Sequence, residues 1–443
     1  MTEKNTGNSV LWGKGASIAF YTLGCKLNFS ETSTLARRFT EAGFERVAPS
    51  QEADIYVVNT CSVTEHADKK CRQAIRKLTQ RNPAALMVVT GCYAQLKPEE
   101  VAAIDGVDLV LGADQKGNLF EYVNNLRTKG KAQALPCDVR AVDSFFPAFS
   151  SGDRTRSFLK VQDGCDYRCA YCTVPLARGK SRNLPIAGIV KEAETIAASG
   201  VREVVLTGVN IGDFGKTTGE TFFELLQALE KVNGIGRFRL SSIEPNLLTG
   251  DMIEWIAQSE KMTPHFHIPL QSGSNKVLQL MRRRYRREVF AARVQKIRSV
   301  MPHAFIGVDV IAGFPGETAD DFHDTYSFLE QLQPAFLHIF PYSERPGTPA
   351  ATMPGSVPKR ERAARVKALQ TLSTKLHRAF YEKNIGTETR VLWESACKGG
   401  MMQGFTDNYL KLETPYRREL IGRLLPVVVG SGQSQLCLLP AEN

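Results

Sequence analysis

The stretch Gly164-Cys165-Asp166-Tyr167-Arg168-Cys169-Ala170-Tyr171-Cys172 is the most informative part of this sequence. Its cysteines are spaced C-x3-C-x2-C and follow the apolar run 158–161, which we expect to be a strand. Three thiolates this close on a loop suit an iron–sulfur cube and leave one iron without a protein ligand. Structural metal sites are normally closed by four protein ligands, so an open position indicates a site for a reacting molecule. Structural zinc is the alternative, but no fourth Cys or His stands nearby in the sequence.

Length and composition indicate an ordinary globular protein with several domains. The 443 residues predict about three domains, and 43% of them are apolar while 23% are charged. No stretch approaches the roughly 18 apolar residues that a membrane-spanning helix needs, and the polar N-terminus argues against export. Ten cysteines without an export signal indicate reduced thiols. We therefore expect a cytoplasmic protein with no membrane partner.

The net charge of +10 is concentrated in three basic runs. Residues 69–81 hold six Lys or Arg and no acid, residues 265–300 hold nine against one Glu, and residues 354–378 hold seven against one. Each run alone is typical of a solvated helix face. Three such runs in one chain favour a surface that binds nucleic-acid phosphates. The last segment, 376–443, is nearly neutral, with eight basic and seven acidic residues.

Strands and helices alternate in the first part of the chain. Apolar runs predict strands at 16–21, 54–58, 86–89 and 107–111. Helices are predicted at 30–42 and 65–80, and a further helix is expected to end near Lys129. Apolar strands separated by helices predict a parallel sheet with helices on both faces.

A cysteine follows each of the first three predicted strands. These cysteines are Cys25, Cys61 and Cys92. The C-terminal ends of parallel strands lie on one edge of a sheet, which is where such folds bind ligands. We therefore expect the three thiols to converge on a second three-thiolate site. The other cysteines, Cys71, Cys137, Cys397 and Cys437, are expected to be buried as small hydrophobic residues.

A second alternation follows residues 128–156, whose Gly, Pro and Ser content predicts a linker. Strands are predicted at 157–161, 203–207, 237–242, 265–268, 306–311 and 336–340. Helices are predicted at 186–198, 220–232, 248–258, 275–300, 319–331 and 364–383. Six strand–helix units fall short of the eight in a closed barrel. We therefore expect an open, partial (β/α)6 barrel, with its chemistry at the C-terminal ends of the strands.

The final part of the chain changes to short β-rich runs punctuated by Gly and Asn. These runs lie at 390–393, 408–412, 424–429 and 435–438. They predict a small antiparallel barrel of the kind that binds nucleic acids. The predicted fold class is thus α/β, with an N-terminal parallel α/β domain, a central partial (β/α)6 barrel and a C-terminal antiparallel β-barrel. The expected boundaries are a tail at 1–15, a domain at 16–130, a linker at 131–150, a domain at 151–380 and a domain at 381–443.

Loops at the ends of the predicted barrel strands are polar or contain glycine. Besides the cysteine loop, they are 207–210, 242–245, 269–274, 312–317 and 341–343. Each loop alone is typical of ordinary turn chemistry. Together, next to a metal site, they predict a cofactor pocket, because glycine lets the backbone approach a ligand closely.

The cysteine loop and two later motifs resemble the radical S-adenosylmethionine (SAM) enzymes. The three cysteines, with an aromatic residue at Tyr171, resemble the signature of that superfamily. The sequences His267-Ile268-Pro269-Leu270-Gln271-Ser272-Gly273 and Gly313-Phe314-Pro315-Gly316-Glu317-Thr318 resemble motifs of its methylthiotransferase branch. The N-terminal cysteine trio resembles the auxiliary cluster domain of that branch, and the tail resembles its TRAM domain. The resemblance therefore covers nearly the whole chain.

Two local sequences resemble the bacterial members that modify threonylcarbamoyladenosine in tRNA. They are Thr22-Leu23-Gly24-Cys25-Lys26-Leu27-Asn28 and Gly91-Cys92-Tyr93-Ala94-Gln95. Relatives that act on isopentenyladenosine usually have Gln and Met after the first Gly-Cys pair. Those that act on a ribosomal-protein aspartate usually have Pro and Lys there, whereas this sequence has Lys26-Leu27.

The resemblance implies two [4Fe–4S] clusters, held by Cys165, Cys169 and Cys172 and by Cys25, Cys61 and Cys92. The open iron of the first cluster would chelate SAM, and reductive cleavage would give a 5′-deoxyadenosyl radical. In the family this radical takes hydrogen from carbon 2 of adenine, and a methylated sulfur associated with the second cluster is joined there. The residues that we expect to hold SAM are Tyr171, Gly208, Asn210, Glu244, Gln271, Asp309 and Gly313. Each of them has a packing or turn role as the alternative.

The implied partners are tRNA, through an anticodon stem-loop carrying threonylcarbamoyladenosine 37, and an electron donor such as a flavodoxin or ferredoxin. We assign phosphate contacts chiefly to Arg282–Arg287 and the other basic helices. Phe405, Tyr409 and Tyr416 are candidates for stacking on bases, with core packing as the alternative. Two alternative functions keep the chemistry but change the substrate, to isopentenyladenosine 37 or a ribosomal-protein aspartate. A third alternative is a non-catalytic Fe–S or zinc RNA-binding protein.

Overall fold

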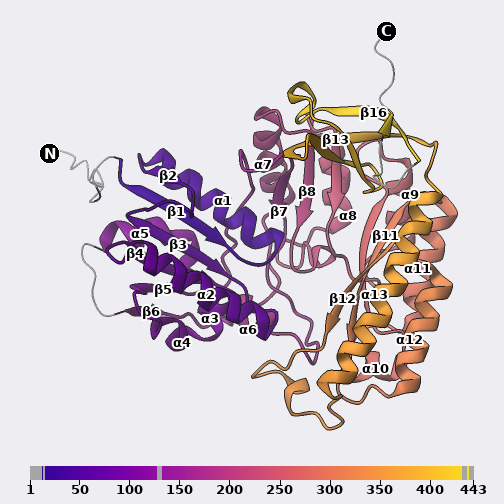
Figure 1. Ribbon diagram of the computed structural model, residues 1–443, viewed down its shortest axis with the longest axis horizontal. Helices are drawn as coiled ribbons and strands as arrows, with labels where there is room; N and C mark the ends of the chain where they lie inside the picture. Colours follow the sequence, from indigo (N-terminus) through magenta and orange to yellow (C-terminus); the bar gives the residue numbers. More distant parts are fainter. Residues whose placement is uncertain (1–11, 13–14, 127–131, 432–436, 439–443) are drawn as a thin grey trace. The chain divides into compact units, whose positions relative to one another are not determined.

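The computed structural model describes residues 12, 15–126, 132–431 and 437–438, and it divides into two compact units (Figure 1). The first unit comprises Met1–Ala148 with Thr173–Lys180, and the second comprises Phe149–Cys172 with Ser181–Asn443. Within the described ranges, no helix combines the length and the apolar character needed to cross a membrane.

The first unit is built on a sheet in which neighbouring strands are parallel. The strand order is β2 (Glu45–Val47), β1 (Ser17–Thr22), β3 (Ile55–Thr60), β4 (Leu86–Gly91), β5 (Leu109–Leu111) and β6 (Gln133–Leu135). Every residue of β3 and β4 is buried, which confirms a parallel sheet covered on both faces. Strand β6 lies in the stretch expected to be a linker, because three residues are too few to give a periodic signal.

The described helices of this unit include the three that were expected and three short ones that were not. They are α1 (Lys26–Glu41), α2 (Glu65–Arg81), α3 (Cys92–Leu96), α4 (Pro98–Ala102), α5 (Leu119–Asn125) and α6 (Val174–Arg178). Helix α1 was expected from residue 30, but it begins directly after Cys25. Its first turns bury the polar residues Asn28, Ser30 and Glu31, so the apolar period that marks a helix is missing there. The position near Lys129 lies outside the described residues.

The second unit contains six parallel strands in two sheets. The sheets are β7 (Ser157–Lys160), β8 (Glu203–Thr207) and β9 (Arg237–Leu240), and β10 (His265–Gln271), β11 (Phe305–Ala312) and β12 (Phe336–Pro341). Parallel bridges Phe238–Met262 and Ser242–His267 connect the two sheets. Among the described strands, β12 pairs with β11 alone, so it is a free edge. This arrangement confirms the open, partial (β/α)6 barrel.

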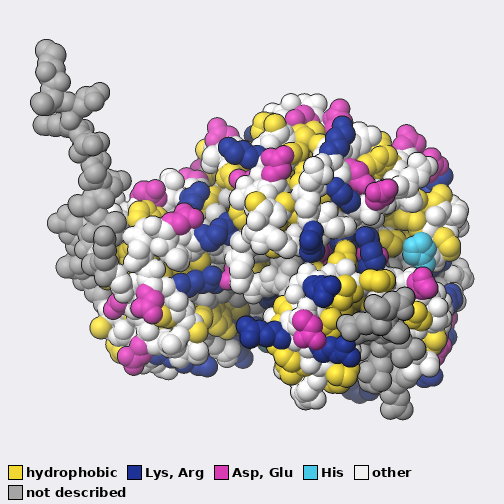
Figure 2. Space-filling model, turned by 90° about the horizontal axis from the view of Figure 1, so that it is seen from above, with side chains coloured by type: hydrophobic (Ala, Val, Ile, Leu, Met, Phe, Trp, Pro, Cys, Tyr) yellow, Lys and Arg dark blue, Asp and Glu magenta, His cyan; other side chains and the backbone are white. Residues whose placement is uncertain are grey.

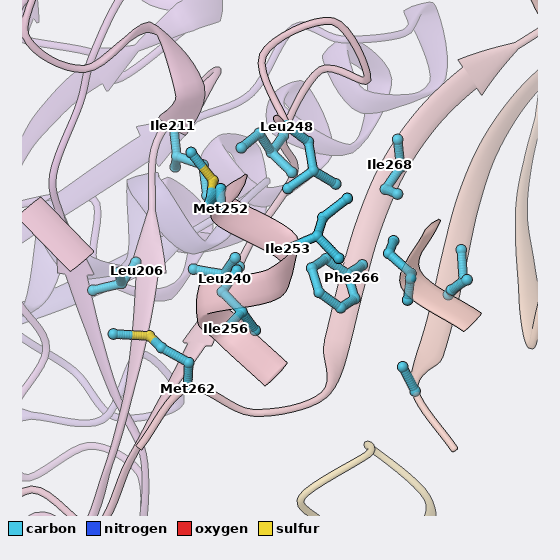
Figure 3. Close-up of a cluster of buried hydrophobic side chains, with 14 of the residues drawn as sticks. Leu206, Ile211, Leu240, Leu248, Met252, Ile253, Ile256, Met262, Phe266 and Ile268 are labelled. Carbon is cyan, nitrogen blue, oxygen red and sulfur yellow. The ribbon is translucent and has the colours of Figure 1, made fainter. Parts of the chain in front are cut away.

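Helices cover the outer face of the barrel strands. They are α7 (Ile186–Ala198), α8 (Phe222–Glu230), α9 (Gly250–Gln258), α11 (Arg287–Val300), α12 (Ala319–Leu332) and α13 (Lys359–Glu382). Figure 3 shows Leu240 of β9 and Phe266 of β10 near Ile253 and Ile256 of α9, in one apolar core. Burying each such side chain contributes roughly 1.5–3 kcal/mol. Because strand residues alternate in direction, the residues between these core positions face the barrel interior.

The helix expected at 275–300 is two helices, α10 (Asn275–Leu280) and α11. The chain between them turns at Arg282, which has φ 57°. Tyr285 is buried there, and its hydroxyl donates to the carbonyls of Pro269 and Leu270 at 2.6 and 3.0 Å. The sequence did not reveal this break because the connecting segment contains neither Gly nor Pro.

The C-terminal residues form an antiparallel sheet with its own core, which confirms the expected small β-structure. The strand order is β15 (Lys411–Pro415), β14 (Met401–Thr406), β13 (Glu388–Lys398), β16 (Leu424–Val429) and β17 (Cys437–Leu438). Strand β14 was not expected, because Gly404 interrupts its pattern. A Cβ atom at Gly404 would lie 2.4 Å from Cγ1 of Val391, so this glycine allows close strand packing and not a turn. Residues 435 and 436 of the last predicted strand lie outside the described ranges.

A buried ion network joins this sheet to the N-terminal ends of β8 and β9. Glu203 accepts from Arg237 at 2.7 Å and from Arg239 at 2.9 Å. Arg237 also donates to the carbonyl of Phe405 at 2.8 Å, and Arg239 to that of Thr406 at 3.0 Å. Burial opposes ionisation of Glu203, but the two arginines hold its pKa well below the usual range. The C-terminal sheet therefore lies against the N-terminal end of the barrel.

Phe405 and Tyr409 take part in this internal contact. Their rings stack with centroids 4.8 Å apart. Arg156 lies 4.6 Å from the ring centroid of Phe405, and Arg239 lies 4.7 Å from that of Tyr409. These contacts favour packing over base stacking for both rings, whereas Tyr416 is 40% exposed.

Candidate functional site

The cysteine loop follows β7 in the second unit. Cys169 is buried, and Cys165 and Cys172 are half-buried. Burial raises the pKa of Cys165 to about 12, and the nearby thiols of Cys172 and Cys169 add to the rise. The thiols therefore hold protons that a metal must displace when it binds, so loading of the site depends on pH. Three neighbouring thiols on one loop are a donor set that fits an iron–sulfur cluster.

Gln162 holds the cysteine loop in place and was missed in the sequence. Its amide nitrogen donates to the carbonyls of Asp163 and Gly164 at 3.0 and 2.7 Å. Its amide oxygen accepts from the backbone N–H groups of Val209 and Asn210, each at 3.0 Å. The side chain thus connects the cysteine loop with the loop after β8. In the sequence, the position of this glutamine between an apolar strand and a glycine was the feature that could have indicated its role.

Arg283 contacts a cysteine of the loop and was also missed, because it belongs to a basic run. Its side chain is 2% exposed, and its guanidinium donates to Cys169 Sγ at 3.0 Å and to the Tyr171 hydroxyl at 3.3 Å. It also pairs with Glu244. A cation that donates to a thiolate ligand stabilises its negative charge and tunes a metal site from outside. Arg283 was expected to contact phosphate as part of Arg282–Arg287, but its guanidinium is bonded to other side chains of the protein.

We expect Arg283→Gln to make the reduction potential of the cluster bound at Cys165–Cys172 more negative. The anionic cluster would lose a cationic hydrogen-bond donor, which favours its oxidised state. The ratio of reduced to oxidised cluster at a fixed potential should fall about tenfold, which corresponds to about 59 mV for one electron. Redox titration followed by electron paramagnetic resonance measures this in a background that lacks the three N-terminal cysteines. Arg282→Gln, at an exposed neighbour, is the control, and equal potentials in the two variants would contradict the role.

Five of the residues expected to hold SAM lie at C-terminal ends of barrel strands. They are Tyr171, Gly208, Asn210, Glu244 and Gln271. Asn210 is 4% exposed, and within the described part of the chain neither polar atom of its side-chain amide has a hydrogen-bond partner. A buried unpaired amide is costly unless a ligand satisfies it. Asn210 therefore fits a site for a polar ligand.

Gly208, Gln271 and Glu244 carry local features that suit a ligand site. A Cβ atom at Gly208 would lie 2.9 Å from Oε1 of Gln162, so glycine allows the two loops to pack closely. Gln271 has φ 69°, a strained conformation for a residue with a side chain, and such strain is concentrated at functional sites. Burial raises the pKa of Glu244, and the nearby Arg283 opposes this rise.

Gly313 also lies at the C-terminal end of a barrel strand, and Asp309 lies within a strand but close enough to Glu244 to add to the rise in the pKa of that carboxyl. Asp309 lies inside β11, and its Oδ1 accepts from Nε2 of His267 at 2.6 Å. Gly313 follows β11, but a Cβ atom there would lie 2.4 Å from Cγ of Arg362. This glycine therefore accommodates a side chain of α13.

The N-terminal cysteine trio lies at the C-terminal ends of strands in the first unit. Cys61 directly follows β3, Cys92 directly follows β4, and Cys25 follows β1 and caps α1. Burial raises the pKa of Cys61 to about 12, and the nearby thiols of Cys92 and Cys25 raise it further. Cys92 is also the first residue of α3, and thiolates are favoured at helix N-termini. The structure thus brings the three predicted thiols into one neighbourhood.

A glycine precedes both Cys25 and Cys92, and close packing requires it. Gly24 has φ 108°, and a Cβ atom there would lie 3.0 Å from Sγ of Cys61. Gly91 has φ 99°, and a Cβ atom there would lie 2.4 Å from the carbonyl oxygen of Thr60. The two glycines therefore let the neighbouring loops approach the cysteine that follows β3.

A buried ion cluster supports α1 within the first unit. Glu31 pairs with Arg178 at 3.0 Å and with Lys116 at 2.6 Å. All three residues are buried, and removing one partner of a buried ion pair costs about 3–5 kcal/mol. Arg178 lies in Thr173–Lys180, which directly follows Cys172 in sequence yet packs as part of the first unit.

The remaining cysteines differ in burial. Cys71 is buried, and its thiol donates to the carbonyl of Cys61 at 3.4 Å. Cys137 is half-buried, and Cys397 is exposed, although both were expected to be buried. Cys397 lies near the end of β13 in the C-terminal sheet, where the last four residues of the strand are all exposed. The side chain of Cys437 lies outside the described part of the structure.

The basic runs differ in how many of their charges remain exposed. The exposed cations of α2 are Lys69, Lys70, Arg76 and Lys77. In α13, Arg362 and Arg365 are buried, and Arg365 pairs with Glu317 at 2.6 Å. The exposed cations of α13 are Lys359, Arg360, Lys367, Lys375 and Arg378. On the face shown in Figure 2, Lys and Arg side chains are interspersed with Asp and Glu. Exposed cations therefore remain in all three basic runs.

Known families match two parts of the chain. Residues 17–112 match the family described as Uncharacterized protein family UPF0004. Residues 159–329 match the Radical SAM superfamily. The first match contains the N-terminal cysteine trio, and the second contains the cysteine loop and four of the six barrel strands in full, β8 to β11.

Similar proteins cover nearly the whole chain. A threonylcarbamoyladenosine tRNA methylthiotransferase, MtaB, of Bacillus subtilis is 40% identical over 94% of both chains. The protein of that name from Aquifex aeolicus is 38% identical over 93% of this chain and 100% of its own. A tRNA-2-methylthio-N(6)-dimethylallyladenosine synthase of Corynebacterium diphtheriae is 35% identical over 87% of this chain and 77% of its own.

A solved structure shares the fold. The radical SAM methyltransferase TsrM of Kitasatospora setae, with cobalamin and a [4Fe–4S] cluster bound, aligns with a TM-score of 0.57. The alignment covers 76% of this chain and 77% of that chain at 16% identity. At 16% identity, this alignment shows that the two proteins share a fold.

Proposed function

Because this chain belongs to the radical SAM methylthiotransferase family, we propose that it methylthiolates carbon 2 of N6-threonylcarbamoyladenosine at position 37 of tRNA. The product is 2-methylthio-N6-threonylcarbamoyladenosine, and the enzyme is a transferase. The observation that carries this proposal is the 40% identity to the Bacillus subtilis threonylcarbamoyladenosine tRNA methylthiotransferase over 94% of both chains.

Two [4Fe–4S] clusters and SAM are the cofactors. When bound, they supply a radical that removes hydrogen from carbon 2 and the methylated sulfur that replaces it. Cys165, Cys169 and Cys172 hold the cluster that binds SAM, and the N-terminal cysteine trio holds the other. Gln162 supports this assignment by fixing the cysteine loop, and the unpaired amide of Asn210 offers a donor and an acceptor for SAM.

Each predicted domain has its own role in the proposed reaction. Residues 16–130 hold the second cluster, residues 151–380 carry out the radical chemistry, and residues 381–443 bind RNA together with exposed basic side chains. Arg284 is one of these, since it is exposed although its guanidinium also lies 4.1 Å from the ring centroid of Tyr167. The modified base must leave its stack to reach the barrel. We place the reaction in the cytoplasm, away from membranes, with a flavodoxin or ferredoxin as electron donor.

A second candidate substrate is isopentenyladenosine 37, because the Corynebacterium diphtheriae relative is named for that chemistry. A ribosomal-protein aspartate is the third candidate substrate. Mass spectrometry of tRNA nucleosides from a strain lacking this gene separates the candidates. We expect loss of the methylthio-threonylcarbamoyl nucleoside, and its return when the gene is restored.

Other outcomes of this experiment would redirect the proposal. Persistence of the nucleoside in a strain without a second such enzyme would refute the threonylcarbamoyladenosine assignment. Loss of the methylthio-isopentenyl nucleoside alone would reassign the substrate. A separate measurement on the purified protein tests for catalysis itself: tightly bound zinc with no cleavage of SAM under reduction would favour a non-catalytic RNA-binding protein.

A further inference from the structure

Three ionisable side chains gather on the inner face of the barrel. They are His267 on β10, Asp309 on β11 and His338 on β12. Their neighbours along the strands belong to the apolar core on the outer face, and these neighbours are Phe266, Ile268, Val308, Val310 and Leu337. Because strand residues alternate in direction, the three side chains point into the barrel. Asp309 and His338 are also register partners on adjacent strands.

The three side chains form one compact cluster. Oδ1 of Asp309 accepts from Nε2 of His267 at 2.6 Å, and the rings of His267 and His338 lie 4.8 Å apart between centroids. One nitrogen or oxygen atom from each residue lies within 4.8 Å of the others. The cluster thus presents hydrogen-bond donors and an acceptor to one small volume.

This cluster lies between the two ends of the barrel. Toward the N-terminal ends of the strands lies the buried network around Glu203, whose arginines bond to carbonyls of the C-terminal sheet. Toward the C-terminal ends, Gln271 stands four residues after His267 on the same strand, roughly 13 Å away at about 3.3 Å per residue. A molecule that enters the barrel below the expected SAM site therefore meets these three residues.

The cluster is also accessible from outside the barrel. The side chains of His267 and Asp309 are 21% and 18% exposed, although they point inward. A groove of about 1130 Å³ runs between β12 and α13, and its lining includes His338, Phe336 and Phe340. Phe340 is 44% exposed, and β12 has no partner on this side among the described strands. The open side of the barrel therefore offers an entrance for an unstacked base.

We propose that His267, Asp309 and His338 form the subsite for the N6-substituent of the tRNA base, an inference that rests on the function proposed above. The threonylcarbamoyl group carries a carboxylate, a hydroxyl and ureido N–H groups. Imidazole N–H groups donate to the carboxylate, and the Asp309 carboxylate accepts from the hydroxyl or an N–H group. An isopentenyl group offers none of these partners, so it would form none of these hydrogen bonds with the three side chains.

This chemistry gives the subsite a role in choosing the substrate. A site built to hydrogen-bond a polar group discriminates strongly against an analogue that lacks the group. The competing occupant is a divalent cation, because two imidazoles and a carboxylate are also a metal ligand set.

The test measures binding of short anticodon stem-loop RNAs to the enzyme reconstituted with both clusters. The RNAs carry threonylcarbamoyladenosine, isopentenyladenosine or adenosine at position 37, and fluorescence anisotropy gives Kd for each. We expect the wild type to bind the threonylcarbamoyl RNA most tightly. In His338→Gln and in Asp309→Asn this preference over the adenosine RNA should fall about tenfold or more. His323→Gln, at an exposed histidine of α12, is the matched control and should keep the preference of the wild type.

Two variants keep the test informative if one fails to fold, since Asp309→Asn preserves the shape of the side chain. An unchanged preference in folded variants, or an equal loss for all three RNAs, would overturn the subsite. Stoichiometric bound Mn²⁺ or Zn²⁺ that disappears in both variants would assign the cluster to a cation instead. A wild type that prefers the threonylcarbamoyl RNA but leaves it unmodified would refute the proposed reaction while supporting the subsite.

Discussion

A Cys169→Ala variant is expected to form no 5′-deoxyadenosine from SAM and no methylthiolated nucleoside. Cys169 is the buried member of the loop trio, and its Sγ accepts from Arg283 at 3.0 Å. Without this thiolate, two ligands remain for a cube that needs three protein sulfurs in such a site. Iron content should fall from about eight to about four per chain, because each cluster holds about four irons. Chromatography of the SAM reaction products and iron analysis after anaerobic reconstitution measure both effects.

The control for this variant is Cys397→Ala. Cys397 is exposed in the C-terminal sheet, so its removal should leave iron content and SAM cleavage at the wild-type level. If Cys169→Ala retained full activity, the radical mechanism itself would be wrong. If both variants lost iron, the loss would reflect failed reconstitution of the clusters and not the loss of a cluster ligand at Cys169.

A Cys61→Ala variant is expected to separate the two halves of the reaction. It should still cleave SAM under reduction, because the loop trio is intact, but it should yield no methylthiolated tRNA. Cys61 directly follows β3 and lies among the thiols of Cys25 and Cys92, so its loss removes a ligand of the second cluster. Product analysis should show 5′-deoxyadenosine without the modified nucleoside, together with about four irons per chain.

Cys71→Ala is the matched control, since this buried thiol stands beside Cys61 without belonging to the predicted trio. Its thiol donates to the carbonyl of Cys61 at 3.4 Å, so its replacement tests general disturbance of the same region. We expect about eight irons per chain and retained sulfur insertion. Loss of sulfur insertion in Cys71→Ala with the second cluster intact would show that the trio alone does not define the sulfur-delivering site.

Strand positions were predictable because they depend on local chemistry. Runs such as 203–207 are apolar and bounded by helical segments, and β8 matches that prediction residue for residue. The helix at 275–300 was predicted wrongly, because the turn at Arg282 depends on Tyr285 bonding to β10 carbonyls. That contact joins distant parts of the chain and leaves no periodic signal.

The interpretation of basic and aromatic residues also depended on distant partners. Arg283 looked like a phosphate-binding residue, but it lies against Cys169 and Glu244. Phe405 and Tyr409 looked available for base stacking, but Arg156 and Arg239 lie over their rings. Residue type limits which interactions a side chain can make, and only the packed structure decides which of them it makes.

The sequence by itself determined the two cysteine trios, the alternation of strands and helices, and the order of the three kinds of fold. These features are carried by residue spacing and local periodicity, which need no knowledge of distant contacts. The tertiary structure decided that Arg283 reaches Cys169, that Gln162 connects two loops, and that His267, Asp309 and His338 meet inside the barrel. Strand pairing brings these residues together across long sequence separations, and a single sequence carries no direct record of that pairing.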